Sequence, residues 1–333
     1  MSHITLRDIA KEAGVSTTTI SRALNDKPDV SPKTKDKILG IAKNLGYTPN
    51  LLAKSLRSRK SKTIGVILAD ISNPFFSAVA KGIEDAARKR NYSIILCNTD
   101  EKYEKEEEAV QVLVEKRVDG LLITPVQKEY KDILRIKEQK IPLVLVSRHF
   151  DTIKTNSVVS DDVLGGFLAT EYLIKKGHRK ILYISGPLHI SSATERLKGY
   201  KRALRKCKIP FEEKLVRGYI AKMGEAYTLM RKILKKKLDF TAVFTFSDFL
   251  ALGVMKALRE EKSKIPDDVA VVGYDDIEFA SILEIPLTTV HMPKYRLGVE
   301  GVNMLIDDIE GKSSAKKLQK LTIKPELIVR KSA

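Results

Sequence analysis

The chain has 333 residues, of which 43% are hydrophobic and 31% charged, so it is a soluble globular protein too long for a single compact core. Its net charge of +18 favours an anionic partner. The first 60 residues hold 12 Lys and Arg against 5 Asp and Glu and are about three times as basic per residue as the rest, which predicts a nucleic-acid-binding unit there. A basic bias general to the organism is the alternative.

The start of the chain indicates a cytoplasmic protein. His3, Arg7 and Asp8 interrupt the first ten residues, which therefore do not form an export signal. No apolar stretch approaches the roughly 20 residues that cross a bilayer, so we expect no membrane contact. Cys97 and Cys207 lack metal-ligand spacing, as expected in a reducing compartment.

The first predicted elements are two short helices joined by a glycine. Thr5 can cap a helix that Gly14 ends, because glycine tolerates the left-handed conformation of a tight helix exit. Ser16 can cap a second helix over residues 17–24, and a third begins at Ser31. The first two helices, joined by the turn at Gly14, form a helix-turn-helix arrangement.

The second helix has one apolar and one polar face. Ile20, Ala23 and Leu24 face inward. The outward face carries small or hydrogen-bonding side chains: Thr17, Thr18, Ser21, Arg22 and Asn25. Such a face suits base edges in the major groove, where a threonine methyl can contact thymine and an arginine can bind guanine or a phosphate. The alternative is a solvated helix face without a partner.

The motifs LRDIAKEAGVSTTTISRALN, VSPKTKDKILGIAKNLGYTPN and LLAKSLRS resemble the headpiece of the lac-repressor (LacI/GalR) family, and the match extends through essentially the whole chain. The resemblance implies a headpiece over residues 1–49 and a hinge over 50–61. It also implies operator specificity set mainly by Thr17 and Thr18, with Leu56 as an apolar wedge in the minor groove. The residues expected to contact DNA are Thr5, Ser16, Thr17, Thr18, Ser21, Arg22, Asn25, Asn50, Ala53, Lys54, Leu56 and Arg57.

The expected hinge helix is about ten residues long and therefore marginal alone in water, so it can form when DNA and a second copy complete its surroundings. Inserting an apolar side chain between base pairs costs stacking but permits a bent duplex with more protein contact. A plain basic linker is the alternative.

From Thr63 onward, apolar runs of strand length alternate with helical patterns. The runs are TIGVILA, YSIILC, GLLIT, PLVLVS, KILYIS, TAVFTF and VAVVGY. This alternation predicts an α/β fold with parallel sheets covered on both faces. The family resemblance implies two doubly wound, periplasmic-binding-protein-like lobes that the chain connects three times. We expect one lobe over residues 62–160 and 291–321, and the other over 161–290 and 322–333.

Ligands bind such sheets at the carboxyl ends of the strands. Taking the residues after each predicted strand, with those that the resemblance marks, gives ten expected effector contacts: Asn73, Phe75, Phe76, Arg148, Asp161, Ser192, Arg196, Ser247, Asp248 and Asp275. Charged hydrogen-bonding groups and aromatic faces are what a sugar needs. Asn73, Ser247 and Asp275 could instead be helix caps.

The motifs NPFF at Asn73–Phe76 and GYDD around Asp275 are similar to those of ribose-binding proteins and the ribose repressor. However, Ser147 stands where that group has an aspartate, and Ser247 where it has an asparagine. Ile190 replaces an arginine of the purine-responsive branch. We therefore expect a small-molecule effector, with a monosaccharide favoured and ribose itself left open.

We expect neither enzymatic activity nor a cofactor or metal. The five histidines lack metal-binding spacing, and no nucleophile lies in a recognisable catalytic motif. The hypothesis is a homodimeric repressor of a roughly palindromic operator, with the effector as inducer or corepressor. The alternatives are a regulator driven by a phosphoprotein corepressor and a sugar-binding module without DNA specificity.

Overall fold

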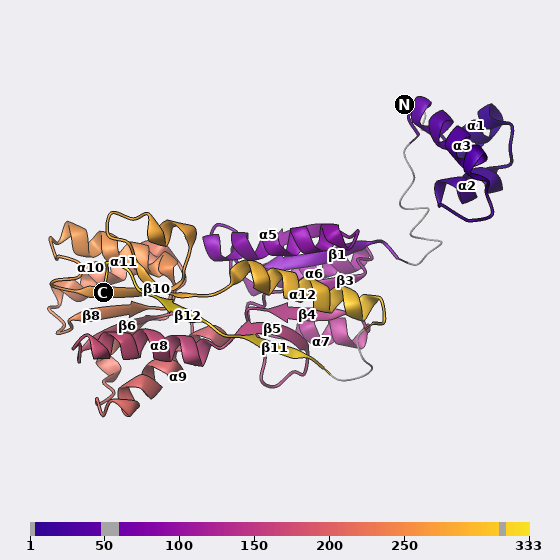
Figure 1. Cartoon of the computed structure of the whole chain (residues 1–333). Coiled ribbons are helices and arrows are strands. Elements are labelled where there is room, and N and C mark those ends of the chain that lie inside the picture. The colour runs from indigo at the N-terminus through magenta and orange to yellow at the C-terminus, as the bar shows by residue number, and fades with distance from the viewer. Residues whose placement is uncertain (1–3, 48–59, 313–317) are drawn as a thin grey trace. The chain divides into compact units, whose positions relative to one another are not determined.

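The computed structural model describes residues 4–47, 60–312 and 318–333, which form two compact units divided at Ser61. The first unit contains three helices, α1 (Leu6–Ala13), α2 (Thr17–Leu24) and α3 (Pro32–Asn44), as the sequence predicted (Figure 1). A small core joins them: Ile9, Ala10, Ala13, Ile20, Ala23, Ile38 and Ala42. Gly14 has φ +70° and ends α1, as expected of a glycine at that position.

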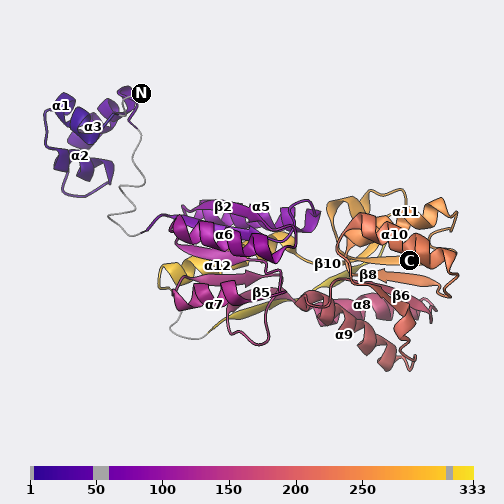
Figure 2. The same cartoon turned by 180° about the vertical axis from the view of Figure 1, so that it is seen from behind.

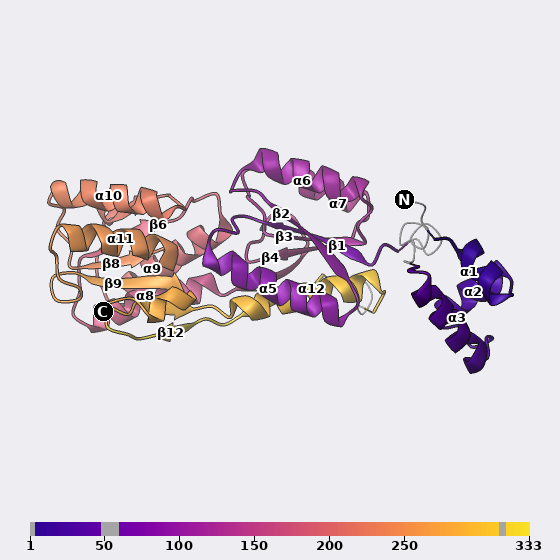
Figure 3. The ribbon, with the colours of Figure 1, turned by 90° about the horizontal axis from the view of Figure 1, so that it is seen from above.

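The second unit contains two six-stranded sheets. In the first lobe the sheet order is β11-β5-β4-β3-β1-β2, and all its pairings are parallel. Its strands are β1 (Thr63–Leu68), β2 (Ser93–Asn98), β3 (Gly120–Ile123), β4 (Leu143–Val146), β5 (Asn156–Ser160) and β11 (Lys320–Ile323). Helices α5 (Pro74–Lys89) and α12 (Lys294–Ile309) cover one face, and α6 (Tyr103–Glu115) and α7 (Lys131–Glu138) cover the other (Figure 3).

The second lobe repeats this plan with sheet order β12-β10-β9-β8-β6-β7. Its strands are β6 (Ile181–Ser185), β7 (Val216–Gly218), β8 (Ala242–Thr245), β9 (Ala270–Asp275), β10 (Thr288–His291) and β12 (Glu326–Ile328). The covering pairs are α8 (Asp162–Lys175) with α9 (Ser191–Lys206), and α10 (Met223–Lys235) with α11 (Asp248–Glu260) (Figure 2). Two 3₁₀ turns, Glu213–Leu215 and Glu278–Ser281, complete the lobe.

The chain passes between the sheets after β5, after β10 and after β11. The expected third boundary, Leu321, lies inside β11, so this crossing falls between Ile323 and Glu326. The strand that follows, β12, pairs antiparallel with β10, unlike the parallel pairing expected throughout. It enters the second sheet directly from the junction, where that sheet's parallel strands end, and therefore runs in the opposite direction.

Two acidic side chains are buried in the first lobe. Glu106 is 0% exposed and Asp132 is 3% exposed. Glu106 Oε2 accepts a hydrogen bond of 2.7 Å from the Val126 amide, while burial and the neighbouring Asp132 carboxyl raise the pKa of Glu106 to about 8. Burial also raises the pKa of Asp132. The pair is therefore expected to retain a proton at neutral pH.

Within the described residues, no helix is long and apolar enough to span a membrane. The same residues contain no cluster of three or more His, Cys, Asp or Glu side chains arranged to hold a metal ion. Cys97 and Cys207 are free thiols.

Candidate functional site

The outward face of α2 is available to a partner. The Ser16 side chain accepts a 3.1 Å hydrogen bond from the Thr19 amide and so begins the helix. Ile20 and Ala23 are buried against the headpiece core, which leaves Thr17 and Thr18 exposed. The polar side chains are therefore presented together because the apolar ones fix the rotation of the helix.

Three other expected DNA contacts have partners in the protein. Arg22 Nη1 lies 2.6 Å from Asp29 Oδ2, and both side chains are largely exposed. Asn25 Nδ2 donates a 2.7 Å hydrogen bond to the Ser21 carbonyl, at the end of α2. The Thr5 hydroxyl and amide both donate to the Asp8 carboxylate and lower the pKa of Asp8. Such exposed contacts can exchange for DNA contacts at low cost.

Five expected DNA contacts lie outside the described residues: Asn50, Ala53, Lys54, Leu56 and Arg57.

A cavity of about 560 Å³ lies between the two lobes of the second unit. Eight of the ten expected effector contacts line it: Asn73, Phe75, Phe76, Arg148, Ser192, Arg196, Ser247 and Asp275. They come from both lobes and follow the carboxyl ends of strands or lie on the helices beyond them.

Arg148 projects from the loop after β4 and is 3% exposed. Its guanidinium donates two hydrogen bonds to the Glu101 carboxylate, of 2.9 and 2.5 Å, and another of 2.9 Å to the Pro125 carbonyl. The Phe76 ring lies 5.9 Å from the guanidinium carbon. The arginine is thus neutralised and oriented before any ligand arrives.

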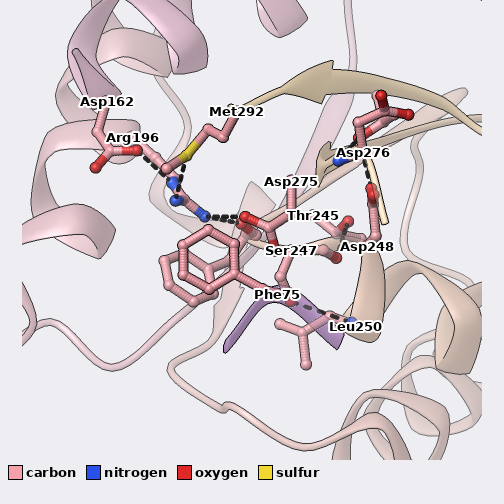
Figure 4. Close-up of polar contacts among 12 residues, drawn as sticks. Phe75, Asp162, Arg196, Thr245, Ser247, Asp248, Leu250, Asp275, Asp276 and Met292 are labelled. Carbon is pink, nitrogen blue, oxygen red and sulfur yellow. Dashed lines mark hydrogen bonds and ion pairs between the residues drawn. The ribbon is translucent and has the colours of Figure 1, made fainter. Parts of the chain in front are cut away.

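Arg196 on α9 has the same degree of burial, 3%, and its own carboxylate partner (Figure 4). Its Nε donates to Asp162 Oδ1 at 2.8 Å, and its Nη1 to the Phe246 carbonyl at 2.5 Å. The guanidinium also lies 3.6 Å from the centre of the Tyr274 ring. The guanidinium carbon lies 4.5 Å from the centre of the Phe246 ring as well, and Arg196 and Phe246 both line the cavity.

The close packing of α8 against α9 places Arg196. A Cβ atom at Gly166 would lie 2.3 Å from the Arg196 carbonyl oxygen. Any larger residue at Gly166 would therefore push α9, and the arginine with it, away from Asp162.

Asp275 ends β9 beside Arg196, with 3.7 Å between Oδ1 and Nη1. Burial raises the pKa of Asp275 well above its usual range, although Arg196 opposes the shift. The residue has φ +113°, which side-chain-bearing residues rarely adopt and which concentrates at binding sites. Asp275 does not cap a helix, because the next helical turn begins at Glu278.

Asn73 and Ser247 both cap a helix and line the cavity. Asn73 Oδ1 accepts from the Phe75 amide at 3.0 Å, and Ser247 Oγ accepts from the Leu250 amide at 3.3 Å. Both residues also line the cavity.

The structure places Asp161 and Asp248 away from the cavity lining. Asp161 caps α8 by accepting from the Leu164 amide at 2.9 Å. Asp248 is 0% exposed and accepts from the Ile277 amide at 2.9 Å and the Thr289 hydroxyl at 2.6 Å, while burial raises its pKa to about 7. It holds the turn that follows Asp275.

Other residues of the cavity lining were not predicted from the sequence and include Glu101, Lys128, Tyr219, Lys222, Glu225 and Phe246. Most of them lie in the loops after β2, β3 and β7 or at the start of α10. Examining the residues after every strand, including the short β7, would have found these loops.

Comparison with family models decides the classification. Residues 5–50 match the model described as bacterial regulatory proteins, lacI family, and residues 61–330 match periplasmic binding proteins and sugar binding domain of LacI family. The chain belongs to the LacI family. The predicted fold class is confirmed, and this protein is a DNA-binding transcriptional regulator.

Relatives of this LacI-family protein agree. It is 37% identical over 328 residues to the HTH-type transcriptional repressor PurR of Vibrio atlanticus (strain LGP32), covering 98% of this chain and 97% of the relative. Because such relatives are repressors, the expected non-enzymatic function is confirmed.

Two solved structures extend the comparison. The lac repressor dimer bound to operator and the anti-inducer ONPF has a TM-score of 0.89 at 28% identity, with 99% of both chains covered. A LacI family transcriptional regulator from Enterococcus faecium with bound ribose has a TM-score of 0.72 at 29% identity, covering 81% of this chain and 98% of the other.

Proposed function

We propose that this LacI-family regulator acts as a cytoplasmic homodimeric repressor whose operator affinity is controlled by a monosaccharide bound between the lobes. The interlobe cavity carries the proposal. A ligand that contacts both lobes binds one lobe arrangement better than others and can thereby change DNA affinity.

The chemistry of the cavity supports a sugar. Arg148 and Arg196 present fixed charged donors, and the rings of Phe75 and Phe76 meet edge to face with centroids 5.0 Å apart. Adjacent hydroxyls suit the donors, and the C–H face of a sugar suits the rings. The Enterococcus relative with bound ribose supports the same ligand class.

Two positions of the cavity lining restrict the class of effector that we expect. Ile190 is 1% exposed and lines the cavity where the purine-responsive branch has an arginine, so this wall lacks that donor for a purine. Ser147, also in the lining, is shorter than the aspartate of the ribose-binding group. The preferred monosaccharide therefore need not be ribose.

On DNA, each protomer of the dimer would place α2 in a major groove, with Thr17, Thr18 and Arg22 toward the bases. The two half-sites would lie about one helical turn apart or at a comparable distance set by the dimer. The lac repressor relative, a dimer bound to operator, supports this arrangement. Sedimentation of the DNA-free protein should show a dimer at micromolar concentration; a monomer would contradict the proposal.

Calorimetry of the full chain with a panel of monosaccharides and purines, followed by operator titration with each ligand, tests the effector. At least one monosaccharide should bind and change operator affinity, whereas tight binding of a purine alone would overturn the proposal. Modulation by a phosphoprotein without any metabolite would favour the corepressor alternative. Sugar binding with equal affinity for operator and random DNA would favour a sugar-binding module.

A further inference from the structure

Three residues form a closed ring of hydrogen bonds across the lobe junction. Gln127 and His149 belong to loops of the first lobe, after β3 and β4, and Ser191 is the first residue of α9 in the second lobe. The Ser191 amide donates to Gln127 Oε1 at 2.8 Å, the Gln127 amide group donates to the His149 carbonyl at 2.7 Å, and the His149 amide donates to Ser191 Oγ at 3.1 Å. We call these three residues the interlobe latch.

The latch completes the start of α9. The residue at the N-cap position is Ile190, which has no side chain able to accept a hydrogen bond. The first-turn amides of a helix lack partners within the helix. Gln127 supplies an acceptor to one of them from the other lobe, whereas Asn73, Asp161 and Ser247 cap α5, α8 and α11 from within the same chain segment.

The backbone conformation holds Gln127 toward this position. Gln127 has φ +65°, which is uncommon for a residue with a side chain, and it is half-buried. The preceding Val126 amide is held by the buried Glu106 carboxyl. The loop that carries Gln127 is therefore anchored to α6 within the first lobe.

Each latch residue is adjacent in sequence to residues that line the cavity. Gln127 precedes Lys128, His149 follows Arg148, and Ser191 lies between Ile190 and Ser192. Because each latch residue is covalently bonded to a lining residue, a ligand that moves the lining residues also moves the latch. The latch is thus placed to respond to occupancy while it joins the lobes.

We propose that the interlobe latch holds the lobes in the arrangement described here, in which both lobes line the cavity, and that Gln127 is a positioning residue for the effector response. This inference rests on the proposed effector cavity. Opening the lobes breaks the bonds to Ser191, so the latch favours the arrangement in which ligand can contact both lobes. By linkage, weakening the latch lowers effector affinity by the factor by which it depopulates this arrangement.

The test compares Gln127→Ala with Gln111→Ala in the full-length protein. Gln111 lies in the same lobe, on α6, and bonds to Glu115 of its own helix. Amide hydrogen exchange is measured without ligand. Gln127→Ala should accelerate exchange in the first turn of α9, in the other lobe, whereas Gln111→Ala should leave it unchanged.

Calorimetry then measures binding of the sugar identified for the wild-type protein. Gln127→Ala should weaken it about 10-fold through the loss of one to two hydrogen bonds, while Gln111→Ala should bind normally. Gln127→Glu keeps the acceptor for Ser191 but loses the donor to His149, so it should restore protection of α9 and part of the affinity.

Unchanged exchange at α9 in Gln127→Ala would overturn the proposal, as would unchanged sugar affinity with altered exchange. If no sugar binds the wild-type protein, the proposed effector fails, but the exchange experiment still decides whether Gln127 holds the second lobe. The two failures are therefore distinguishable.

Discussion

Arg22 in the headpiece and Arg196 in the effector unit carry the same group in opposite surroundings. Arg22 is paired with Asp29 where both side chains are exposed, at 57% and 46%. Arg196 and Asp162 are 4% and 2% exposed. An exposed pair contributes about 0–1 kcal/mol, whereas removing one partner from a buried pair costs about 3–5 kcal/mol.

This difference suits the two tasks. A bidentate contact to guanine provides about 1–3 kcal/mol of discrimination, enough to outcompete the Arg22–Asp29 pair when DNA arrives. If Arg196 moved away from Asp162, the Asp162 carboxylate would remain buried without a partner, which is energetically costly. We therefore expect Arg22 to exchange Asp29 for DNA, whereas the arginines of the cavity are already held by their carboxylate partners.

The largest expected difference between the two regions is in how strongly salt weakens their ligand binding. Operator affinity should fall about 10³–10⁵-fold between 50 and 200 mM salt, as expected for about 6–10 phosphate contacts. Effector affinity should change by no more than about a few-fold, because buried pairs are screened much less. Titrations of both ligands over this range test the contrast; parallel losses would contradict it.

Arg196→Ala should be the most damaging single change in the cavity. It leaves the Asp162 carboxylate buried without its guanidinium partner, so the free energy of unfolding should fall by about 3–5 kcal/mol. Effector binding should be lost, while the folded fraction should still bind operator. Urea unfolding and calorimetry provide the measurements. Arg205→Ala, at an exposed site on the same helix, is the matched control.

The buried acid Glu106 should make the effector unit pH-sensitive. Its pKa is raised from 4.5 to about 8, so the protonated form is favoured in the folded state. The folded protein therefore binds more protons than the unfolded chain between these values, and stability should fall as pH rises from about 4.5 to about 8. At about 1.4 kcal/mol per pKa unit, the free energy of unfolding should fall by at most about 5 kcal/mol over this range.

Glu106→Gln should flatten this part of the pH profile of unfolding, whereas Glu107→Gln, exposed on the same helix, should not. An unchanged slope in Glu106→Gln would show that other groups cause the pH dependence. The thermal unfolding of the headpiece, followed as a separate transition, should not show this pH dependence.

Arg22→Ala should have the smallest effect on stability and a specific effect on DNA. We expect a loss of about 1–3 kcal/mol of preference for operator over random DNA, with unfolding and effector affinity unchanged. Competition binding with both duplexes measures it. Asp29→Asn releases Arg22 without removing it and should retain the preference; loss of preference there would show that the ion pair itself is needed.

The headpiece could be predicted closely from sequence. Its three helices have the expected order and caps, because contacts among Ile9, Ile20 and Ile38 join segments close along the chain. The exposed residues of α2 lie within nine consecutive positions, so helical periodicity alone places them on one face.

The effector cavity could be predicted only in part. The strand-end rule found eight lining residues, but Asp161 and Asp248 obey the same rule and lie elsewhere. Both are near strand ends, yet each turns back to satisfy local backbone amides or a neighbouring strand. Sequence position indicates the sheet edge; it does not indicate the direction of a side chain.

The sequence alone thus determined the family, the alternating α/β order and the helix-turn-helix, because these depend on local periodicity and on contiguous motifs. Tertiary structure decided the pairing of Arg148 with Glu101 and of Gln127 with Ser191. These partners are 47 and 64 residues apart along the chain, and they meet because parallel strands end at one edge and two lobes close on each other.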